Sequence, residues 1–336
     1  MVSLAQIRAS NAKLATTLPP GLVAVFAGAT SGIGEASLKQ FAENTCRPRI
    51  YFLGRSEESG TRIRAELQRL NAGGEYHYIS VDISLLRSVD DVCREIKEKE
   101  SVINLLFLST DTDEGLNYPV AVSYYARFRL LVNLLPLLQN ATDLRRVVTV
   151  FTATKEGNID TNDFQARHIP MMAQRGHLSS LTTLSLEAVA KSAPTVSFVH
   201  CFPGFVKTNY GRDVPGVGAA IFRGVLWVLF LFMGPFLVTP LGEVGERQLF
   251  LATSARFPPR GESGTVLGIP LSKDVAVARG TDGKSGSGVY SIDSDAESAP
   301  PKVEQRLENL RKDGIAQKVW AQVQEQFVRI TGNVSI

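Results

Sequence analysis

The stretch that decides the fold is "LVAVFAGATSGIGEASLKQFAE", residues 22–43. It begins as an apolar run, passes through a glycine-rich turn, and continues with the small residues that open a helix. The turn carries Gly28, Gly32 and Gly34 in the spacing G-x-x-x-G-x-G. A strand, a turn of this kind and a helix in that order are typical of a segment that binds a nucleotide.

Each glycine of this turn has a physical task. Gly28 permits the tight turn off the strand, Gly32 lets backbone approach a pyrophosphate, and Gly34 lets the helix pack close to the sheet. The free N–H groups and the positive dipole end of the helix then face the phosphates. A plain tight turn is the alternative. The cofactor-binding residues expected here are Gly28, Thr30, Ser31, Gly32, Ile33 and Gly34.

Apolar runs alternate with helical patterns through the first two thirds of the chain. After the first strand, further strands are expected in residues 47–55, 76–84, 102–110, 145–153 and 195–204. Helical patterns separate them, the longest over 119–140 and another over 177–192. This alternation predicts an α/β fold with a doubly wound parallel sheet, the Rossmann fold, in a single domain with a C-terminal helical extension.

Prolines and a glycine-rich stretch suggest how the chain is divided. Residues 1–20 predict a short helix that stops before Pro19-Pro20, and residues 21–270 form the nucleotide-binding domain with a substrate lid over 209–241. Residues 271–300 are expected to be a flexible loop, of which the Gly/Ser/Asp-rich part 279–299 is a surface loop or weak hairpin. Residues 301–336 contain two amphipathic helical runs.

Composition excludes several classes of protein. The 44% hydrophobic and 21% charged residues argue against disorder, and a net charge of +3 does not indicate nucleic acid as a partner. Cys46, Cys93 and Cys201 fit no zinc spacing, so no metal is expected. Odd, widely separated cysteines and an N-terminus without a long apolar core favour a reducing, cytoplasmic location.

One apolar segment, "GVLWVLFLFMGPFLVTPL" at 224–241, bears no charge and is broken by Gly234-Pro235. One interpretation is that this segment packs on the protein's own core or over an apolar substrate. Dipping into a membrane surface is a second, and a spanning helix is a third, although the length is at the lower limit for crossing a bilayer. The alternatives stay open, and a membrane-associated protein is among them.

The second strand ends at Arg55 and not at an acidic residue. An Asp or Glu there would bind the ribose 2′-hydroxyl and repel a 2′-phosphate, whereas Arg offers that phosphate a charge-assisted fork. This favours NADP(H) over NAD(H) as the cofactor. A solvated strand end is the alternative for Arg55.

"GATSGIG", the Asp82 of "VDIS", and "PGFVKT" at 203–208 follow one another in this chain. In this order they resemble the short-chain dehydrogenase/reductase family, over residues 20 to 255. The resemblance implies that Asp82 caps the adenine and that Thr208 holds the nicotinamide carboxamide. The turn implied to lie beside the nicotinamide comprises Pro203, Gly204 and Val206.

The C-terminal part resembles fungal members of this family found among secondary-metabolite enzymes. The family transfers a hydride between nicotinamide C4 and a carbonyl or alcohol carbon. Its members often pair through the helices of the fourth and fifth crossovers, which implies a homo-oligomer.

The catalytic residues that the resemblance implies are missing. The family uses a Tyr and a Lys four residues later, but counting back from Leu181 puts Met171 and Arg175 at those positions. The fifth strand ends in Phe151-Thr152 where the family has Ser-Ser. "LSTD" at 108–111 replaces Asn-Asn-Ala-Gly, and Ser123 replaces the helical Asn.

Other groups are candidates for the lost chemistry. Thr152 keeps a hydroxyl for the substrate oxygen, and Arg175 is placed to hold the nicotinamide ribose or an acidic substrate. Tyr124 or its neighbour Tyr125 is placed to present a phenol to the pocket, with a half-buried packing tyrosine as the alternative. Lys155, Glu156 and His177 are further groups near the strand end, with exposed-loop and helix-start roles as alternatives. The catalytic candidates are Thr152, Tyr124 and Arg175.

Three functions remain on this reading. The lid segment, rich in Phe, Leu and Trp, suits an apolar ligand such as a polyketide or terpenoid, so an NADP(H)-dependent oxidoreductase acting on an apolar secondary metabolite is expected first. A non-redox isomerase, cyclase or dehydratase on the same scaffold is the second. A non-catalytic NADP-binding protein is the third.

Overall fold

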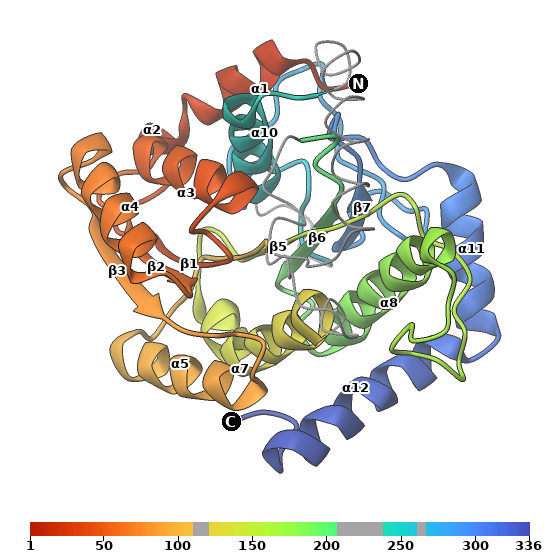
Figure 1. Cartoon of the computed structure of the whole chain (residues 1–336). Helices are drawn as coiled ribbons and strands as arrows, with labels where there is room; N and C mark the ends of the chain where they lie inside the picture. The colour runs from red at the N-terminus through yellow and green to blue at the C-terminus, as the bar shows by residue number, and fades with distance from the viewer. Residues whose placement is uncertain (110–120, 207–237, 261–266) are drawn as a thin grey trace.

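The computed structural model describes residues 1–109, 121–206, 238–260 and 267–336, without the side chains at 121–123 and 171–172. Its centre is a parallel sheet of seven strands in the order β3-β2-β1-β4-β5-β6-β7. The strands are β1 (Val23–Ala27), β2 (Arg49–Gly54), β3 (Glu75–Ser80), β4 (Leu105–Leu108), β5 (Arg146–Val150), β6 (Ser197–Cys201) and β7 (Val289–Ile292). The predicted doubly wound α/β fold is confirmed (Figure 1).

The strands read as continuous apolar runs because both faces of the sheet are covered. Along β1, Val23, Val25 and Ala27 enter one buried core. Ala24 and Phe26 enter the other. The same alternation runs through the neighbouring strands, so a shift of register by one residue would exchange the two cores.

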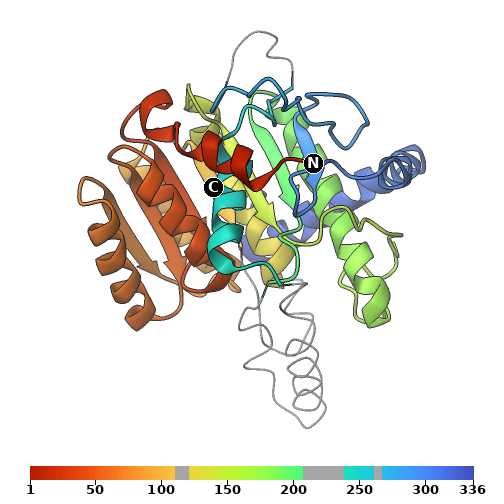
Figure 2. The same ribbon diagram turned by 90° about the horizontal axis from the view of Figure 1, so that it is seen from above.

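Two helical layers cover the sheet. One contains α3 (Gly32–Asn44), α4 (Glu57–Leu70), α10 (Leu241–Thr253) and the N-terminal α1 (Leu4–Asn11) and α2 (Leu14–Thr17). The other contains α5 (Leu86–Lys99), the π-helix η1 (Ala121–Ala126), α7 (Arg127–Asn140), α8 (Met171–Ser192), α11 (Pro301–Lys312) and α12 (Ile315–Thr331). Figure 1 shows α5, α7, α8 and α12 along one side of the sheet, and Figure 2 shows α1 beside α10 on the other.

The N-terminal helix is present as expected and is docked by polar contacts. Ser3 and Gln6 form a capping box at the start of α1. Arg8 pairs with Glu246 of α10 at 2.7 Å, and the amide of Asn11 donates to the Glu246 carbonyl at 2.8 Å. The start of the chain is thereby attached to the layer over the nucleotide-binding half.

The seventh strand corrects the expectation of loop structure over 279–299. Arg279 and Ser285 do form an isolated antiparallel bridge, as in a weak hairpin. Residues 289–292, however, form β7, which is fully buried and pairs in parallel with β6. Four residues after Gly288 carry no periodicity of their own, so this strand exists because β6 supplies its partner. The other boundaries of the predicted division stay predictions.

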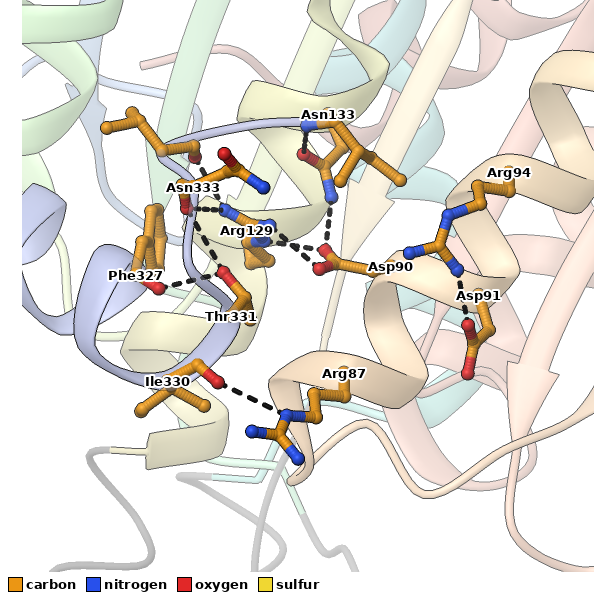
Figure 3. Close-up of polar contacts among 12 residues, drawn as sticks. Arg87, Asp90, Asp91, Arg94, Arg129, Asn133, Phe327, Ile330, Thr331 and Asn333 are labelled. Carbon is orange, nitrogen blue, oxygen red and sulfur yellow. Dashed lines mark hydrogen bonds and ion pairs between the residues drawn. The ribbon is translucent and has the colours of Figure 1, made fainter.

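The two C-terminal helices are confirmed, and the tail after them is held by a buried ion pair (Figure 3). Arg129 of α7 forms a two-point contact with Asp90 of α5 at 2.6 and 2.7 Å. The same guanidinium donates to the carbonyls of Asn333 and Val334 at 2.8 and 2.6 Å. Asn133 donates to Asp90 at 2.8 Å. One arginine therefore joins α5, α7 and the tail.

The C-terminal extension also packs on the helix of the fifth crossover, since α12 contacts both α8 and α5. The expected homo-oligomer stays a prediction. Within the described ranges, no helix is both long and apolar enough to cross a membrane. Most of the apolar segment 224–241, up to residue 237, lies outside the described residues, so its predicted membrane contact also stays a prediction.

We expect Asp90→Asn to lower the free energy of unfolding by about 3–5 kcal/mol, because it leaves the charge of Arg129 buried without its partner. Urea unfolding of the purified variant measures this. The matched control is Asp91→Asn, because the Asp91 side chain is 73% exposed where that of Asp90 is 5% exposed. Loss of the surface pair with Arg94 should change the same quantity by less than about 1 kcal/mol. Equal effects of the two substitutions would contradict the role given to the buried pair.

Candidate cofactor and reaction site

The candidate site lies at the carboxyl ends of β1 and β4, where the strand order changes direction. The sheet extends from β1 through β2 to β3 on one side, and from β4 through β5 to β7 on the other. Parallel sheets of this kind bind ligands in the crevice at such a switch point. The glycine-rich turn after β1 and the described residues that directly follow β5 and β6 lie at this edge.

The turn after β1 has the predicted backbone. Gly28 and Gly32 have φ angles of 77° and 58°, in the left-handed region that favours glycine. A Cβ built on Gly34 would lie 2.1 Å from the Gly28 carbonyl oxygen, so the helix packs against the turn only because residue 34 has no side chain. The side chain of Ser31 does not cap α3. The first-turn N–H groups of α3 are therefore directed toward the position of a phosphate.

The adenosine end of the site is formed by the ends of β2 and β3. A Cβ at Gly54 would lie 2.2 Å from Cγ2 of Thr30, so the turn after β1 rests on the end of β2. Gly54 pairs with Ser80 in the register of the two strands, which places Arg55 and Asp82 just beyond the same edge. Both side chains are exposed, and Asp82 accepts a hydrogen bond from the Ser84 N–H at 2.9 Å.

The other charges near this end are already paired. Arg62 of α4 contacts Glu35 of α3 at 2.9 and 3.0 Å, and Lys39 bonds both Glu35 and Glu66. Burial alone would raise the pKa of Glu35, but the bonds from Arg62 and Lys39 outweigh it and lower that pKa. Arg55, by contrast, forms no ion pair or hydrogen bond with any described residue. Its guanidinium is thus available to an anionic ligand.

The reaction end is formed by residues that follow β5 and β6. Thr152 is half-buried, and its hydroxyl makes a long 3.4 Å bond to the carbonyl of Arg175. The exposed Arg175 guanidinium lies 4.9 Å from the ring centre of Phe202, a cation–π contact. Phe202 precedes the half-buried Pro203 and Gly204. The structure therefore brings Thr152 and Arg175 together at the edge where the resemblance places the nicotinamide.

The expectation for Tyr124 is wrong. Its side chain is only 2% exposed, and its hydroxyl bonds Ser185 of α8 at 2.6 Å. Ser185 is ten residues beyond Arg175, about 15 Å further along the helix and away from the strand ends. Burial raises the pKa of Tyr124 well above its ordinary value. Tyr125 bonds Gln322 of α12 instead. The cause is packing, since this part of the chain faces α8 and α12.

The remaining candidates, Lys155, Glu156 and His177, differ in how far they are buried. Lys155 is exposed and Glu156 is buried. His177 is buried, with Nδ1 accepting from the Asp160 N–H at 3.2 Å and Nε2 near the Phe164 carbonyl at 3.3 Å, and burial lowers its pKa. His177 is therefore a neutral histidine that joins a loop to the start of α8. This is the helix-start role given above as the alternative for His177.

Several predicted positions lie outside the described residues: Thr110, Asp111, Thr208, most of the lid and the side chains of Ser123 and Met171. Val206 is described, and next to it Phe205 accepts a bond from the Thr239 N–H at 2.9 Å. Among described side chains, no group of three or more His, Cys, Asp or Glu is placed to hold a metal ion.

Sequence reasoning missed the contact between the loop after β5 and the start of α8. Gly157 and Gly176 touch through their backbones, and a Cβ on Gly157 would lie 2.9 Å from Cα of Gly176. Ser179 and Ser180 donate to the carbonyls of Thr152 and Gly157, each at 2.7 Å. The sequence does show a run of small residues at the start of α8, but that run predicts a contact only once the loop that faces it is known.

Comparison with known proteins decides the family. The family model for short chain dehydrogenases matches residues 22–112. An oxidoreductase of Emericella nidulans is 37% identical over 332 residues, which cover 95% of this chain and 96% of the relative. The oxidoreductase andH of Emericella variicolor is 36% identical over 344 residues, 99% of each chain. This chain belongs to the short-chain dehydrogenase family.

A solved structure agrees with this assignment at the level of the fold. Pseudomonas aeruginosa RhlG, in an active-site complex with NADP, gives a TM-score of 0.54 at 15% identity over 76% of this chain and 96% of that chain. The resemblance to the family, the Rossmann fold and the assignment as a nucleotide-binding oxidoreductase are confirmed. The fungal origin of both relatives agrees with the resemblance seen in the C-terminal part.

In this short-chain dehydrogenase, we expect Gly34→Ala to displace the phosphate turn. The added Cβ has no space beside the Gly28 carbonyl, so the substitution should destabilise the fold by ~1–3 kcal/mol and weaken nucleotide binding at least about tenfold. Thermal melting and calorimetric titration with NADPH measure the two effects. The control is Gly242→Ala at the start of α10, where a Cβ meets nothing within 4 Å. A control as impaired as Gly34→Ala would remove the steric explanation.

Proposed function

We propose that the protein is an NADP(H)-dependent oxidoreductase that transfers a hydride between the nicotinamide and a carbonyl or alcohol carbon of an apolar secondary metabolite, such as a polyketide or terpenoid. The observation that carries the proposal is the geometry of the switch point. A phosphate-binding turn without a side-chain cap lies beside an unpaired arginine at one end and the Thr152 hydroxyl at the other.

The residues present fit an NADP(H) cofactor. The close approach of Gly34 to Gly28 leaves backbone N–H groups to hold the pyrophosphate, and the first-turn acid Glu35 is neutralised by Arg62 and Lys39. Arg55 is the cation that remains for a 2′-phosphate, and Asp82 faces the same end for the adenine. The complex of RhlG with NADP supports this choice by analogy of fold.

The bound cofactor would supply the hydride, and the protein's residues would orient the substrate. Thr152 is placed to donate its hydroxyl to the substrate oxygen, exchanging the long bond to the Arg175 carbonyl for a shorter one. Arg175, held over Phe202, is placed to bind the nicotinamide ribose or an acidic group of the substrate. Proximity and orientation can lower the activation barrier by ~7–11 kcal/mol. A positioned general acid typically raises the rate a further ~10²–10⁴-fold. A slow step can proceed without that second contribution, with water supplying the proton.

The apolar substrate is inferred from the entrance to the site. Phe205 is 57% exposed and Leu241 is 39% exposed, and they flank the segment 207–237 on either side. Phe202 packs edge-on against Phe205 with ring centres 6.1 Å apart. Exposed aromatic and aliphatic groups next to the reaction edge favour an apolar ligand.

A non-redox isomerase, cyclase or dehydratase is the second candidate, and one observation favours it. Where α8 meets the loop after β5, the contacts of α8 are made by Arg175, Gly176, Ser179, Ser180 and Thr183. No tyrosine–lysine pair is among these described contacts. A single-turnover experiment with the protein, NADPH and candidate metabolites separates the functions. Loss of NADPH absorbance supports hydride transfer, and product without that loss supports the second candidate. Binding of NADPH alone supports a non-catalytic protein.

We expect Arg55→Gln to lower the affinity for NADPH about 10- to 100-fold and to leave the affinity for NADH unchanged, because a charge-assisted hydrogen bond to phosphate is worth ~1.5–3 kcal/mol. Calorimetric titration with each nucleotide gives the ratio. Arg64→Gln, an exposed arginine on α4, makes the same change of net charge and should leave both affinities within twofold, about the size of a screened long-range effect. An unchanged NADPH affinity in Arg55→Gln would remove the assignment of cofactor preference.

A further inference from the structure

The loop that leaves β5, Thr152–Gly157, is tied at both ends to α8. Ser179 donates to the Thr152 carbonyl and Ser180 to the Gly157 carbonyl, each at 2.7 Å. The Gly157 N–H donates to the Gly176 carbonyl at 2.9 Å. The loop that carries the Thr152 hydroxyl is therefore anchored over a short distance, and its interior has to turn sharply.

The interior of the loop is strained and held by β7. Thr154 has a φ of 64°, a left-handed conformation that is unfavourable for a β-branched residue and persists only where the surroundings impose it. Its N–H donates to the hydroxyl of Ser291 in β7 at 2.8 Å. The Ser291 hydroxyl in turn donates to Oε1 of Glu156 at 2.6 Å. A carboxyl group therefore receives the contact that holds the strained residue.

The Glu156 carboxyl also joins the loop to α8 and β6. Thr183 donates to Glu156 Oε1 at 2.8 Å and lies 2.9 Å from Nδ1 of His200. Because a hydroxyl has one hydrogen, which Thr183 gives to Glu156, the Nδ1–H of His200 must donate to Thr183. The ring of Phe151 stacks on His200 with ring centres 6.4 Å apart. One fully buried network thus connects the loop, α8, β6 and β7.

Burial disfavours the charged forms of both ionisable groups of this network. Oε2 of Glu156 and Nε2 of His200 are buried and bond to no described atom, which is unfavourable for a charged form. Burial raises the pKa of Glu156, with a further rise from Glu187. Burial, and then Arg127, lower the pKa of His200 to about 3. Because the imidazole of His200 is neutral, its 3.8 Å approach to the Glu156 carboxyl group is not an ion pair.

We propose that Glu156 is a positioning residue for the reaction at this edge: its carboxyl group ties the Thr152–Gly157 loop to α8 and β7 and thereby fixes the Thr152 hydroxyl. This inference rests on the proposed function for the step that it serves. It assigns to the buried network a task that neither the cofactor turn nor the Arg55 end performs. Glu156 acts through Thr152 and touches neither substrate nor cofactor.

The test compares two substitutions of the same residue. Glu156→Gln keeps the acceptor oxygen and a neutral head of the same shape, so kcat should stay within about threefold of the wild type. Glu156→Ala removes the two hydrogen bonds by which Ser291 and Thr183 join β7 and α8 to the strained loop, so kcat should fall ~10²-fold, the effect of a misplacement of about 1 Å. The affinity for NADPH should not change in either variant, because the adenosine end is built by other elements.

Glu187→Ala is the matched control. Glu187 is a half-buried glutamate with a raised pKa, on α8 itself, and it pairs with Arg311 of α11 at 2.7 Å. Its loss should lower stability and leave kcat unchanged. Ser291→Ala removes the bridge to Thr154 without altering any carboxyl group, and should lower kcat in the same direction if Glu156→Ala fails to fold.

Hydrogen exchange of the Thr154 and Gly157 amides gives a readout besides activity. Protection should be lost in Glu156→Ala and kept in Glu156→Gln and Glu187→Ala. Wild-type kcat in Glu156→Ala, or equal impairment of Glu156→Gln and Glu156→Ala, overturns the inference. A wild-type protein that consumes no NADPH with any substrate overturns the proposed function, and the exchange data then still decide whether Glu156 holds the loop.

Discussion

The contact on which the rest of the structure depends is the approach of α3 to the turn after β1. A helix can start this close to the end of a strand only where Gly34 lies against the Gly28 carbonyl with no Cβ between them. The approach directs the first N–H groups of α3 to the edge where the strand order reverses. Thr30 then rests on Gly54, so the same turn also sets the end of β2 and the position of Arg55. A defect in this one contact would therefore reach the phosphate position and the adenosine end together.

The opposite half of the edge is built on another principle. Ser179 and Ser180 of α8 bond the loop after β5 through its backbone carbonyls. The strain at Thr154 is matched by contacts from β7, a strand contributed from far along the chain. The loop is held by contacts from α8, β6 and β7. These contacts fix the position of the Thr152 hydroxyl.

Sequence patterns predicted the elements that form from their own residues alone. The glycine turn, the first six strands and the C-terminal helices follow from apolar runs and periodicities that each segment carries by itself. β7 does not, because its four residues are a strand only beside β6. Tyr124 was misjudged for the same reason, since the partner that buries its hydroxyl, Ser185, lies on a helix whose placement the sequence does not state. Glu156 was a candidate group after the fifth strand, with an exposed loop as the alternative, and only the contacts from α8 and β7 show that its carboxyl group is enclosed.

The two ends of the site differ in how they handle charge, and this difference has a functional consequence. At the adenosine end, the charges of Glu35, Arg62 and Lys39 are paired near solvent, whereas the exposed Arg55 forms no ion pair with any described residue and keeps its charge for an anion. At the reaction end, burial disfavours the charged forms of both Glu156 and His200. The hydrogen bonds of this buried network hold the backbone of the loop after β5 in place. The exposed charge of the adenosine end and the buried hydrogen bonds of the reaction end share no residue, so binding strength and loop geometry can vary independently.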